Sequence, residues 1–253
     1  IQNIPVRTPL GREMRRFFTA KDGYLLVDAD YSQIELRVLA HISGDEIMKK
    51  AFLDGVDIHT VTASQVFNQP IEWVTPDLRS KAKAVNFGIV YGIGAFSLSK
   101  DIGVSVPKAS EYIRSYLSKY SGIAHYMEQT VAKAKRDGYV ETMFGRRRYI
   151  KELAAKNKNL QAFGERVAKN TPIQGTAADI IKIAMIKVYN RLKESGLDAK
   201  LILQVHDELI VEAKEDCAEK VALLLKEEME NAVKLTVPMT VDVNIGKTWY
   251  DTH

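Results

Sequence analysis

The order of apolar and polar positions along the chain predicts its helices and strands. Short apolar runs bounded by turn residues indicate strands, whereas apolar residues at helical spacing indicate helices. The expected strands cover residues 25–29, 200–205, 209–212 and 240–245. The expected helices cover residues 34–42, 58–67, 76–91, 107–119, 123–137, 160–195 and 215–233. Asp57 directly precedes the second of them, and the helix over 160–195 is expected to be interrupted near Pro172. Residues 138–149 are expected to form a β-hairpin with Phe144 and Gly145 at its turn.

One strand therefore comes first, a long helical stretch follows, and the remaining strands come last. This order predicts an α+β fold in which a helical subdomain interrupts a platform built around a sheet. The helix over residues 76–91 has clear end signals. Pro76 and Asp77 stand where a helix N-terminus prefers them, and Gly92 is expected to end the helix.

The composition adds little to this picture. The chain has 253 residues, 46% hydrophobic and 27% charged, as ordinary globular proteins do. Its net charge of +4 fits a polyanionic partner, although many proteins without such a partner share it. Cys217 is the single cysteine, which excludes an intrachain disulfide and fits a reducing compartment. The apolar run over residues 180–189 contains Lys182 and Lys187, so no membrane span is expected.

Two aspartates are candidate metal ligands. Asp30 ends an apolar strand, and Asp207 lies in a tight turn between two apolar strands and is followed by Glu208. Two-metal nucleotidyl transfer needs carboxylates that converge on one point, and Mg²⁺ prefers a few carboxylate oxygens together with phosphates and waters. The alternative is that each aspartate is an ordinary turn former or helix cap. Asp28 has the same strand parity as Asp30, so alternation does not separate the two.

The helix over residues 76–91 carries a stripe of cationic and aromatic side chains. Arg79, Lys83, Phe87 and Tyr91 recur every four residues, so they share one broad face of the helix. The face is cationic at one end and aromatic at the other, as a nucleoside triphosphate requires for its phosphates and its base. The alternative is an amphipathic helix with a solvated basic end and aromatic residues in the core.

Three segments, in this order, resemble motifs A, B and C of the family A polymerases, the family of bacterial DNA polymerase I. These segments are DYSQIELR at residues 30–37, RSKAKAVNFGIVYG at 79–92 and VHDEL at 205–209. Five further blocks resemble the same family: QNIP at residues 2–5, DIHT at 57–60, GRRR at 145–148, NTPIQGTAADIIK at 170–182 and WYD at 249–251. The resemblance covers essentially the whole chain.

The resemblance implies a palm, whose antiparallel sheet carries the carboxylates, interrupted by a mostly helical fingers subdomain that carries the nucleotide-binding helix. The expected boundaries are palm over residues 1–57, fingers over 58–165 with the nucleotide-binding helix at 77–91, and palm again over 166–253. Ile1 falls inside the family's palm, and the family's thumb is expected to be absent. A fragment with these limits is expected to be weakly processive or inactive alone, although its site for the chemistry is complete.

The resemblance also implies roles for single residues. Asp30 and Asp207 would hold two Mg²⁺ ions, for which Mn²⁺ can substitute, and the Tyr31 carbonyl would add a ligand. The expected catalytic residues are Asp30, Asp207, Lys83 and the accessory acid Glu208. The expected substrate-binding residues are Arg7, Gln33, Glu35, His59, Arg79, Lys83, Phe87 and Tyr91. The expected DNA-binding residues are Arg166, Asn170, Gln174 and His206.

Two of these residues would set the choice of sugar. Glu35 resembles the family's steric gate, which would cover the sugar 2′ position against Tyr91 and so select deoxyribose. Phe87, where some relatives have Tyr, would lie under the incoming sugar and base and disfavour dideoxynucleotides.

His59 matches the family histidine that reaches toward the phosphates, and its alternative is a core or capping histidine. The alternative for Gln174 is a role beside a helix bend at Pro172.

The implied function is that of a DNA-directed DNA polymerase, which adds deoxynucleotides to a primer 3′-hydroxyl in replication and repair. The implied partners are primer–template DNA and dNTPs. The protein is expected to be a monomer in the bacterial cytoplasm and to associate with the nucleoid. Three rivals are a single-subunit RNA polymerase, a DNA-holding remnant without chemistry and a two-metal nuclease. Glu35 argues against the first, the intact carboxylates argue against the second, and the stripe on the Arg79 helix argues against the third.

Overall fold

The structure is a computed structural model that describes residues 1–4 and 9–252. Arg7, which the resemblance assigns to phosphate binding, lies outside the described residues. The chain divides into two compact units. Unit 1 comprises Ile1–Ile34, Ala177–Lys234 and Met239–His253, and unit 2 comprises Glu35–Thr176 and Leu235–Pro238. The main divisions between the units fall after residues 34 and 176, and the expected palm and fingers boundaries at residues 57 and 165 stay predictions. The assignment of these parts to palm and fingers stays a prediction.

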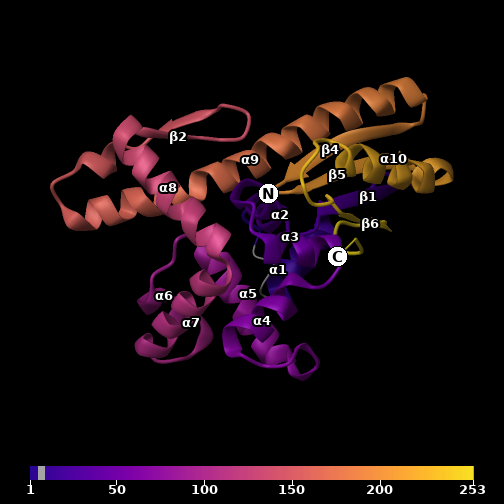
Figure 1. Cartoon of the computed structure of the whole chain (residues 1–253). Coiled ribbons are helices and arrows are strands. Elements are labelled where there is room, and N and C mark those ends of the chain that lie inside the picture. The colour runs from indigo at the N-terminus through magenta and orange to yellow at the C-terminus, as the bar shows by residue number, and fades with distance from the viewer. Residues whose placement is uncertain (5–8, 253) are drawn as a thin grey trace. The chain divides into compact units, whose positions relative to one another are not determined.

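Unit 1 is built around a four-stranded antiparallel sheet, as the apolar runs predicted. Its strands are β1 (Tyr24–Tyr31), β4 (Ala199–Val205), β5 (Glu208–Lys214) and β6 (Val241–Gly246), in the spatial order β4-β5-β1-β6. Figure 1 shows α10 (Ala218–Glu230) running along this sheet, and the Tyr31 hydroxyl donates a hydrogen bond of 2.6 Å to the Met229 carbonyl of that helix. The shorter elements of unit 1 are α1 (Pro9–Glu13), η1 (Met14–Phe17) and η4 (Glu215–Cys217).

Both faces of β1 are buried, which explains why its sequence is a nearly continuous apolar run. Val27 and Ala29 belong to the core on the face of Tyr31, toward α10. Leu26 belongs to a second core cluster on the opposite face, together with Ile210 and Trp249. The strand is therefore held from two sides, and its carboxyl end is a rigid support for a functional side chain.

Unit 2 is mostly helical. Helix α2 (Ile34–Ser43) begins at the last residue of unit 1. The elements that follow are α3 (Glu46–Leu53), α4 (Ile58–Phe67), η2 (Ile71–Trp73), α5 (Pro76–Val90), α6 (Ala95–Ile102), α7 (Val106–Lys119), α8 (Ser121–Asp137), the hairpin β2 (Tyr139–Glu141) and β3 (Arg147–Tyr149), and η3 (Lys151–Ala154). The predicted helices and the hairpin are confirmed. Helices α3 and α6 were not predicted, because each has only eight residues and offers barely two turns of periodicity.

The helix α9 (Lys158–Ser195) is continuous, so the predicted interruption near Pro172 is wrong. A proline inside a helix removes one backbone hydrogen bond and costs about 3 kcal/mol. Buried residues on both sides, Ala168 and Ile173, hold the helix in place. Two arginines of the hairpin add support, since Arg148 donates to the Thr171 hydroxyl at 3.3 Å and Arg146 to the Gly175 carbonyl at 2.9 Å. Within the described part of the chain, no helix is apolar over a length sufficient to cross a bilayer.

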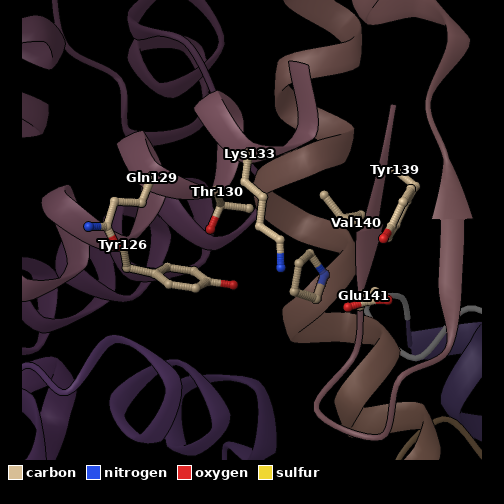
Figure 2. A pocket seen from close by; sticks show the side chains of 8 residues that line it. Tyr126, Gln129, Thr130, Lys133, Tyr139, Val140 and Glu141 are labelled. Carbon is tan, nitrogen blue, oxygen red and sulfur yellow. The ribbon is translucent and has the colours of Figure 1, made fainter. Parts of the chain in front are cut away.

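Unit 2 contains a cavity of about 240 Å³ between α8, β2 and Pro172 of α9. Figure 2 shows the Lys133 amine and the Tyr126 hydroxyl pointing into it, with Glu141 on the side of the hairpin. Burial raises the pKa of Tyr126 to about 12, so the hydroxyl stays protonated at neutral pH. None of the residues that the sequence assigns to a site is among the residues that line this cavity.

The Asp45 carboxylate joins two helices of unit 2, and we expect Asp45→Ala to lower the free energy of unfolding by about 2 kcal/mol. Asp45 is buried, accepts a hydrogen bond from the Met48 amide at the start of α3, and accepts another from the Gly122 amide at the start of α8, both at 3.0 Å. Chemical denaturation measures the change. The matched control is Glu46→Ala, which removes only an exposed ion pair with Lys49 and should leave stability nearly unchanged.

Candidate active site

Unit 1 contains a cavity of about 470 Å³ that brings the two predicted metal ligands together. Asp30 and Asp207 both line it, with Glu208 and His206 beside them. The rest of the lining is formed by Arg12, Arg15, Val205 and Tyr250. Two aspartates that are far apart in the chain therefore meet in one cavity, as the two-metal hypothesis requires.

The register of the sheet explains this meeting. Asp30 is the penultimate residue of β1 and pairs with Glu208, the first residue of β5. The Tyr31 amide donates a hydrogen bond of 3.3 Å to the Asp207 carbonyl, so the turn that holds Asp207 is tied to the end of β1. Glu208 is itself fixed, because one of its oxygens accepts a hydrogen bond of 3.1 Å from the Trp249 indole.

Residues with strained backbone lie close to both Asp30 and Asp207. Among the described residues, the non-glycine residues with positive φ are Gln33, Asn68 and His206. Asn68 ends helix α4, where a left-handed residue is common. Gln33 follows Asp30 by three residues, and His206 directly precedes Asp207, with φ values of 57° and 50°. Such strain costs about 1–3 kcal/mol per residue and is concentrated at functional sites in proteins.

The charges in the cavity suit a divalent cation. Burial raises the pKa of Asp207 and the charge of Glu208 raises it further, while a backbone hydrogen bond and His206 act in the opposite direction. Asp30 has acidic neighbours on both adjacent strands, Glu208 on β5 and Asp242 on β6. Like charges opposite each other destabilise a sheet, and a bound cation offsets that repulsion.

The number of protein carboxylates fits a divalent cation that takes its other ligands from water and substrate. In the described residues, no group of three or more His, Cys, Asp or Glu side chains is arranged to hold a metal ion by itself. Mg²⁺ is commonly held by one or two carboxylates, with waters and substrate phosphates as its other ligands. The pair Asp30 and Asp207 therefore fits a metal that is completed by substrate.

Asp28 and Asp30 share a face of β1 but differ in their surroundings. The Asp28 side chain is 2% exposed, and its Oδ2 accepts a hydrogen bond of 3.0 Å from the Thr252 hydroxyl. Asp30 lies two residues nearer the end of the strand and lines the cavity. Asp28 thus fastens the C-terminal segment to the sheet, which is a role that strand parity could not assign.

Several residues of this cavity were missed from the sequence. Arg12 and Arg15 come from the segment that precedes β1, and Tyr250 follows the last strand. Arg15 lies over the Trp249 ring at 4.1 Å. The available signal was the basic run of residues 12–16, which stands close to the predicted strand but has no spacing that points to carboxylates.

In unit 2, the stripe on α5 forms one face of the helix, as its spacing predicted. Phe87 and Tyr91 are stacked, with ring centroids 6.2 Å apart and an interplanar angle of 19°. Lys83 is exposed, and Arg79 at the start of the helix is exposed as well. Thr75 caps the helix, and Gly92 follows its end with a φ of 65°, which confirms the predicted stop.

Arg79 is held in place by a carboxylate. Its guanidinium donates two hydrogen bonds to Asp57, with Nε–Oδ2 at 2.7 Å and Nη2–Oδ1 at 3.1 Å. Asp57 also caps α4 by accepting from the Thr60 amide. Burial by itself would raise the pKa of Asp57, but the hydrogen bonds from Arg79 and Thr60 lower it to about 2. Both groups therefore stay charged at physiological pH, and the two hydrogen bonds orient the arginine.

His59 lies under this face. It is buried, its ring is 5.8 Å from the Phe87 ring, and its Nδ1 is 3.0 Å from the Asn86 side-chain nitrogen. Burial lowers the pKa of His59 to about 4, and Arg79 and Lys83 lower it as well, against an opposing effect of Asp57. The imidazole is therefore neutral at neutral pH, so it can offer a phosphate a hydrogen bond but not a charge.

Three more of the expected substrate-binding residues lie at helix ends. Gln33 directly precedes α2, and Glu35 stands half-buried in its first turn. Tyr91 is the C-cap residue of α5 and is exposed. Glu35 and Tyr91 both belong to unit 2, whereas Gln33 belongs to unit 1. Their roles stay predictions.

Two of the expected DNA-binding residues of α9 lie against the end of α5. Asn170 donates a hydrogen bond of 3.3 Å to the Val90 carbonyl. A side chain at Gly92 would meet Arg166 at 3.2 Å, so the glycine permits this close approach as well as the positive φ. Arg166 and Gln174 are exposed. His206 is exposed in unit 1, where its Nε2 lies 3.0 Å from the Gln2 carbonyl.

Comparisons with known proteins agree with this geometry. The chain is 52% identical over 252 residues to DNA polymerase I of Caldicellulosiruptor bescii, covering 100% of this chain and 30% of that protein. It is 50% identical over 249 residues to the thermostable DNA polymerase I of Thermus aquaticus, covering 98% of this chain and 30% of that protein. The chain thus spans about 30% of the length of these curated relatives.

A solved structure is similar over the whole chain. It is the POL domain of Pol1 from M. smegmatis in complex with DNA primer-template and dNTP, with a TM-score of 0.95 and 43% sequence identity. The match covers 100% of this chain and 45% of that one. The model of the family described as DNA polymerase family A matches residues 1–251. The chain therefore belongs to DNA polymerase family A.

Proposed function

We propose that the chain carries the catalytic residues of a DNA-directed DNA polymerase, which extends a primer 3′-hydroxyl with deoxynucleotides under the direction of a template. The observation that supports it best is the joint position of Asp30 and Asp207 in one cavity. The solved relative whose title names primer-template and dNTP supplies the substrate class.

Asp30 and Asp207 would hold two Mg²⁺ ions, with the Tyr31 carbonyl as a further ligand. Two such ions lower the pKa of the attacking hydroxyl and stabilise the leaving oxygen in phosphoryl transfer. Asp30 would act from a rigid support, because β1 is packed on both faces, and the turn that holds Asp207 is tied to the end of that strand. Glu208, held by Trp249, would keep the local potential negative and so favour cation binding.

The face of α5 would bind the nucleotide. Arg79, oriented by Asp57, and Lys83 would pair with the triphosphate, and Phe87 would stack under the sugar and base. Lys83 would also donate a proton to the leaving pyrophosphate. His59 would offer its neutral imidazole as a hydrogen-bond donor to the same phosphates. Arg7 and Gln33 complete the proposed substrate-binding set.

The exposed side chains of Arg166, Gln174 and His206 would contact the duplex. Hydrogen bonds to minor-groove acceptors, which all base pairs share, would test the shape of a pair without reading its sequence. Asn170 would act from its position beside Val90. The bacterial relatives make the bacterial cytoplasm the proposed compartment, with nucleoid association and a monomeric state as parts of the same proposal.

A remnant that binds DNA without chemistry is disfavoured by the two carboxylates in one cavity. The test is primer extension by the intact protein that carries this chain, with a primed template, each dNTP alone and a titration of Mg²⁺. The expected result is addition of the complementary nucleotide only, which chelation of the metal abolishes. Addition without a template, or strand cleavage in place of addition, would refute the proposal.

We expect Glu35→Ala to admit ribonucleotides. Glu35 is proposed to occupy the space of a ribose 2′-hydroxyl, so its removal should lower the preference for dNTP over rNTP by about 100-fold. Single-nucleotide insertion kinetics with matched dNTP and rNTP measure the ratio. Glu35→Gln is the matched control, since it keeps the size of the side chain and should keep the preference. An unchanged ratio in Glu35→Ala would remove this residue from the gate.

A further inference from the structure

A chain of buried hydrogen bonds ends at His59 in the core of unit 2. The Tyr120 hydroxyl lies 2.9 Å from Thr62 Oγ1, which lies 3.2 Å from Asn86 Oδ1. The Asn86 side-chain nitrogen in turn lies 3.0 Å from His59 Nδ1. Tyr120, Thr62 and Asn86 are fully buried and His59 is 2% exposed, so water does not compete for these bonds.

The direction of the chain follows from its first member. Burial raises the pKa of Tyr120 to about 12, in spite of its hydrogen bond with Thr62, so the phenol keeps its proton. Thr62 is the only hydrogen-bond partner of that hydroxyl within the described residues. Tyr120 must therefore donate to Thr62, whose own proton goes to Asn86 Oδ1.

The orientation of the Asn86 amide is then set. Its oxygen accepts from Thr62, so its nitrogen faces His59 and donates to Nδ1. In the reverse orientation the Asn86 nitrogen would donate to Thr62, whose oxygen would accept from both Asn86 and Tyr120. The buried Thr62 proton would then have no acceptor among the described residues, and an unsatisfied buried donor is costly.

We propose that Asn86, fixed by Thr62 and Tyr120, is a positioning residue that holds His59 as the tautomer with its proton on Nε2. This inference rests on the proposed function in one respect, namely that the Nε2 proton is offered to the triphosphate. A histidine that accepts through Nδ1 has a single donor left, and that donor is Nε2. Within the described residues, Nε2 makes no hydrogen bond and is not among the enclosed unsatisfied atoms, so it remains available.

A neutral donor has a chemical advantage beside two cations. Arg79 and Lys83 already supply positive charge to the phosphates. These two cations disfavour a further positive charge on His59, whereas the Asp57 carboxylate favours it. A neutral Nε2–H adds direction without adding charge, so it orients the triphosphate without tightening the hold on the pyrophosphate product. If His59 were only a core histidine, the same network would have no effect on catalysis.

The test inverts the hydrogen bond at Asn86. Asn86→Asp has nearly the same shape but can only accept, so His59 must donate through Nδ1, and its pKa must rise beside the new charge. Heteronuclear NMR of the protein labelled at histidine nitrogen reports which ring nitrogen carries the proton. We expect Nε2 in the unmodified protein and Nδ1, or both nitrogens, in Asn86→Asp. A proton on Nδ1 in the unmodified protein would overturn the inference.

Two further variants guard against a fold defect in Asn86→Asp. Thr62→Val keeps the shape of the side chain but removes the hydroxyl that orients the amide, so a mixture of His59 tautomers is expected. Thr62→Ser keeps the hydroxyl and should keep the single tautomer. His59→Gln identifies the His59 signals. A single Nε2-protonated form that persists in Thr62→Val would show that the relay does not position Asn86, and the inference would fail.

Kinetics link the tautomer to the substrate. We expect Asn86→Asp and His59→Leu to raise the KM for dNTP about tenfold through the loss of one directed hydrogen bond, with little change in primer–template affinity. Thr62→Ser should retain the normal KM. The NMR measurement does not depend on turnover. The tautomer inference can therefore fail while the polymerase proposal holds, and the reverse is also possible. A normal KM in a variant with an inverted tautomer would remove His59 and Asn86 from substrate binding.

Discussion

Asp207→Ala should lower the rate of primer extension by about 10³-fold or more while leaving primer–template binding intact, because the proposed metal ions supply several kcal/mol of stabilisation to the transition state. Asp30→Ala should have the same effect, since both side chains line one cavity. Single-turnover extension and DNA binding by fluorescence anisotropy measure the two quantities. Full activity in either variant would end the assignment of the metal site.

Stability separates loss of chemistry from loss of fold. The pKa of Asp207 is raised in the folded state, so its charged form destabilises the fold at pH values above the ordinary pKa of an aspartate. Asp207→Asn should therefore leave the Tm unchanged or raise it. Mg²⁺ should raise the Tm of the unmodified protein more than that of Asp207→Asn, because a ligand stabilises only the state that binds it.

The matched control is Asp216→Ala. Asp216 is an exposed acid of the same unit, paired with Lys214 at 3.3 Å. Its removal changes the net charge of the protein as Asp207→Ala does, and it should leave extension and the effect of Mg²⁺ unchanged. A loss of activity in Asp216→Ala comparable to that in Asp207→Ala would point to general electrostatics in place of a metal site.

Lys83→Ala should lower kcat for nucleotide addition by about 10²–10⁴-fold, the range for loss of a general acid. The ammonium is proposed to protonate the leaving pyrophosphate, and its exposure on α5 leaves it accessible to substrate. Lys83→Arg separates proton transfer from charge, because a guanidinium keeps its charge but does not give up its proton. We therefore expect Lys83→Arg to restore dNTP binding more than kcat.

Lys81→Ala is the control on the same helix. Its ammonium pairs with Asp77 at 2.7 Å, one turn away, and it lies off the stripe formed by Arg79 and Lys83. Its removal should leave dNTP kinetics unchanged. Equal defects in Lys81→Ala and Lys83→Ala, measured by rapid-quench kinetics, would reduce α5 to a generally basic surface and remove the acid role from Lys83.

Patterns within the sequence were enough to predict the local elements and the chemistry that the chain can offer. Periodicity predicted β1 and α5, because the buried face of a strand or of a helix appears as a regular order of apolar and polar residues within a short segment. Spacing placed Arg79, Lys83 and Phe87 on one face for the same reason. The motifs around Asp30 and Asp207 named the family, which comparison over the whole chain then showed.

Features that depend on partners distant in the chain could be assigned only from the folded structure. The Thr252 hydroxyl marks Asp28 as structural, while Asp30, near the end of β1, lines the cavity. Packing on both sides kept α9 continuous through Pro172, where local propensity predicted a break. The proton on His59 depends on Asn86, and the orientation of Asn86 depends on Thr62 and Tyr120. A local pattern does not contain such information, because burial and hydrogen-bond direction arise only when separate elements meet.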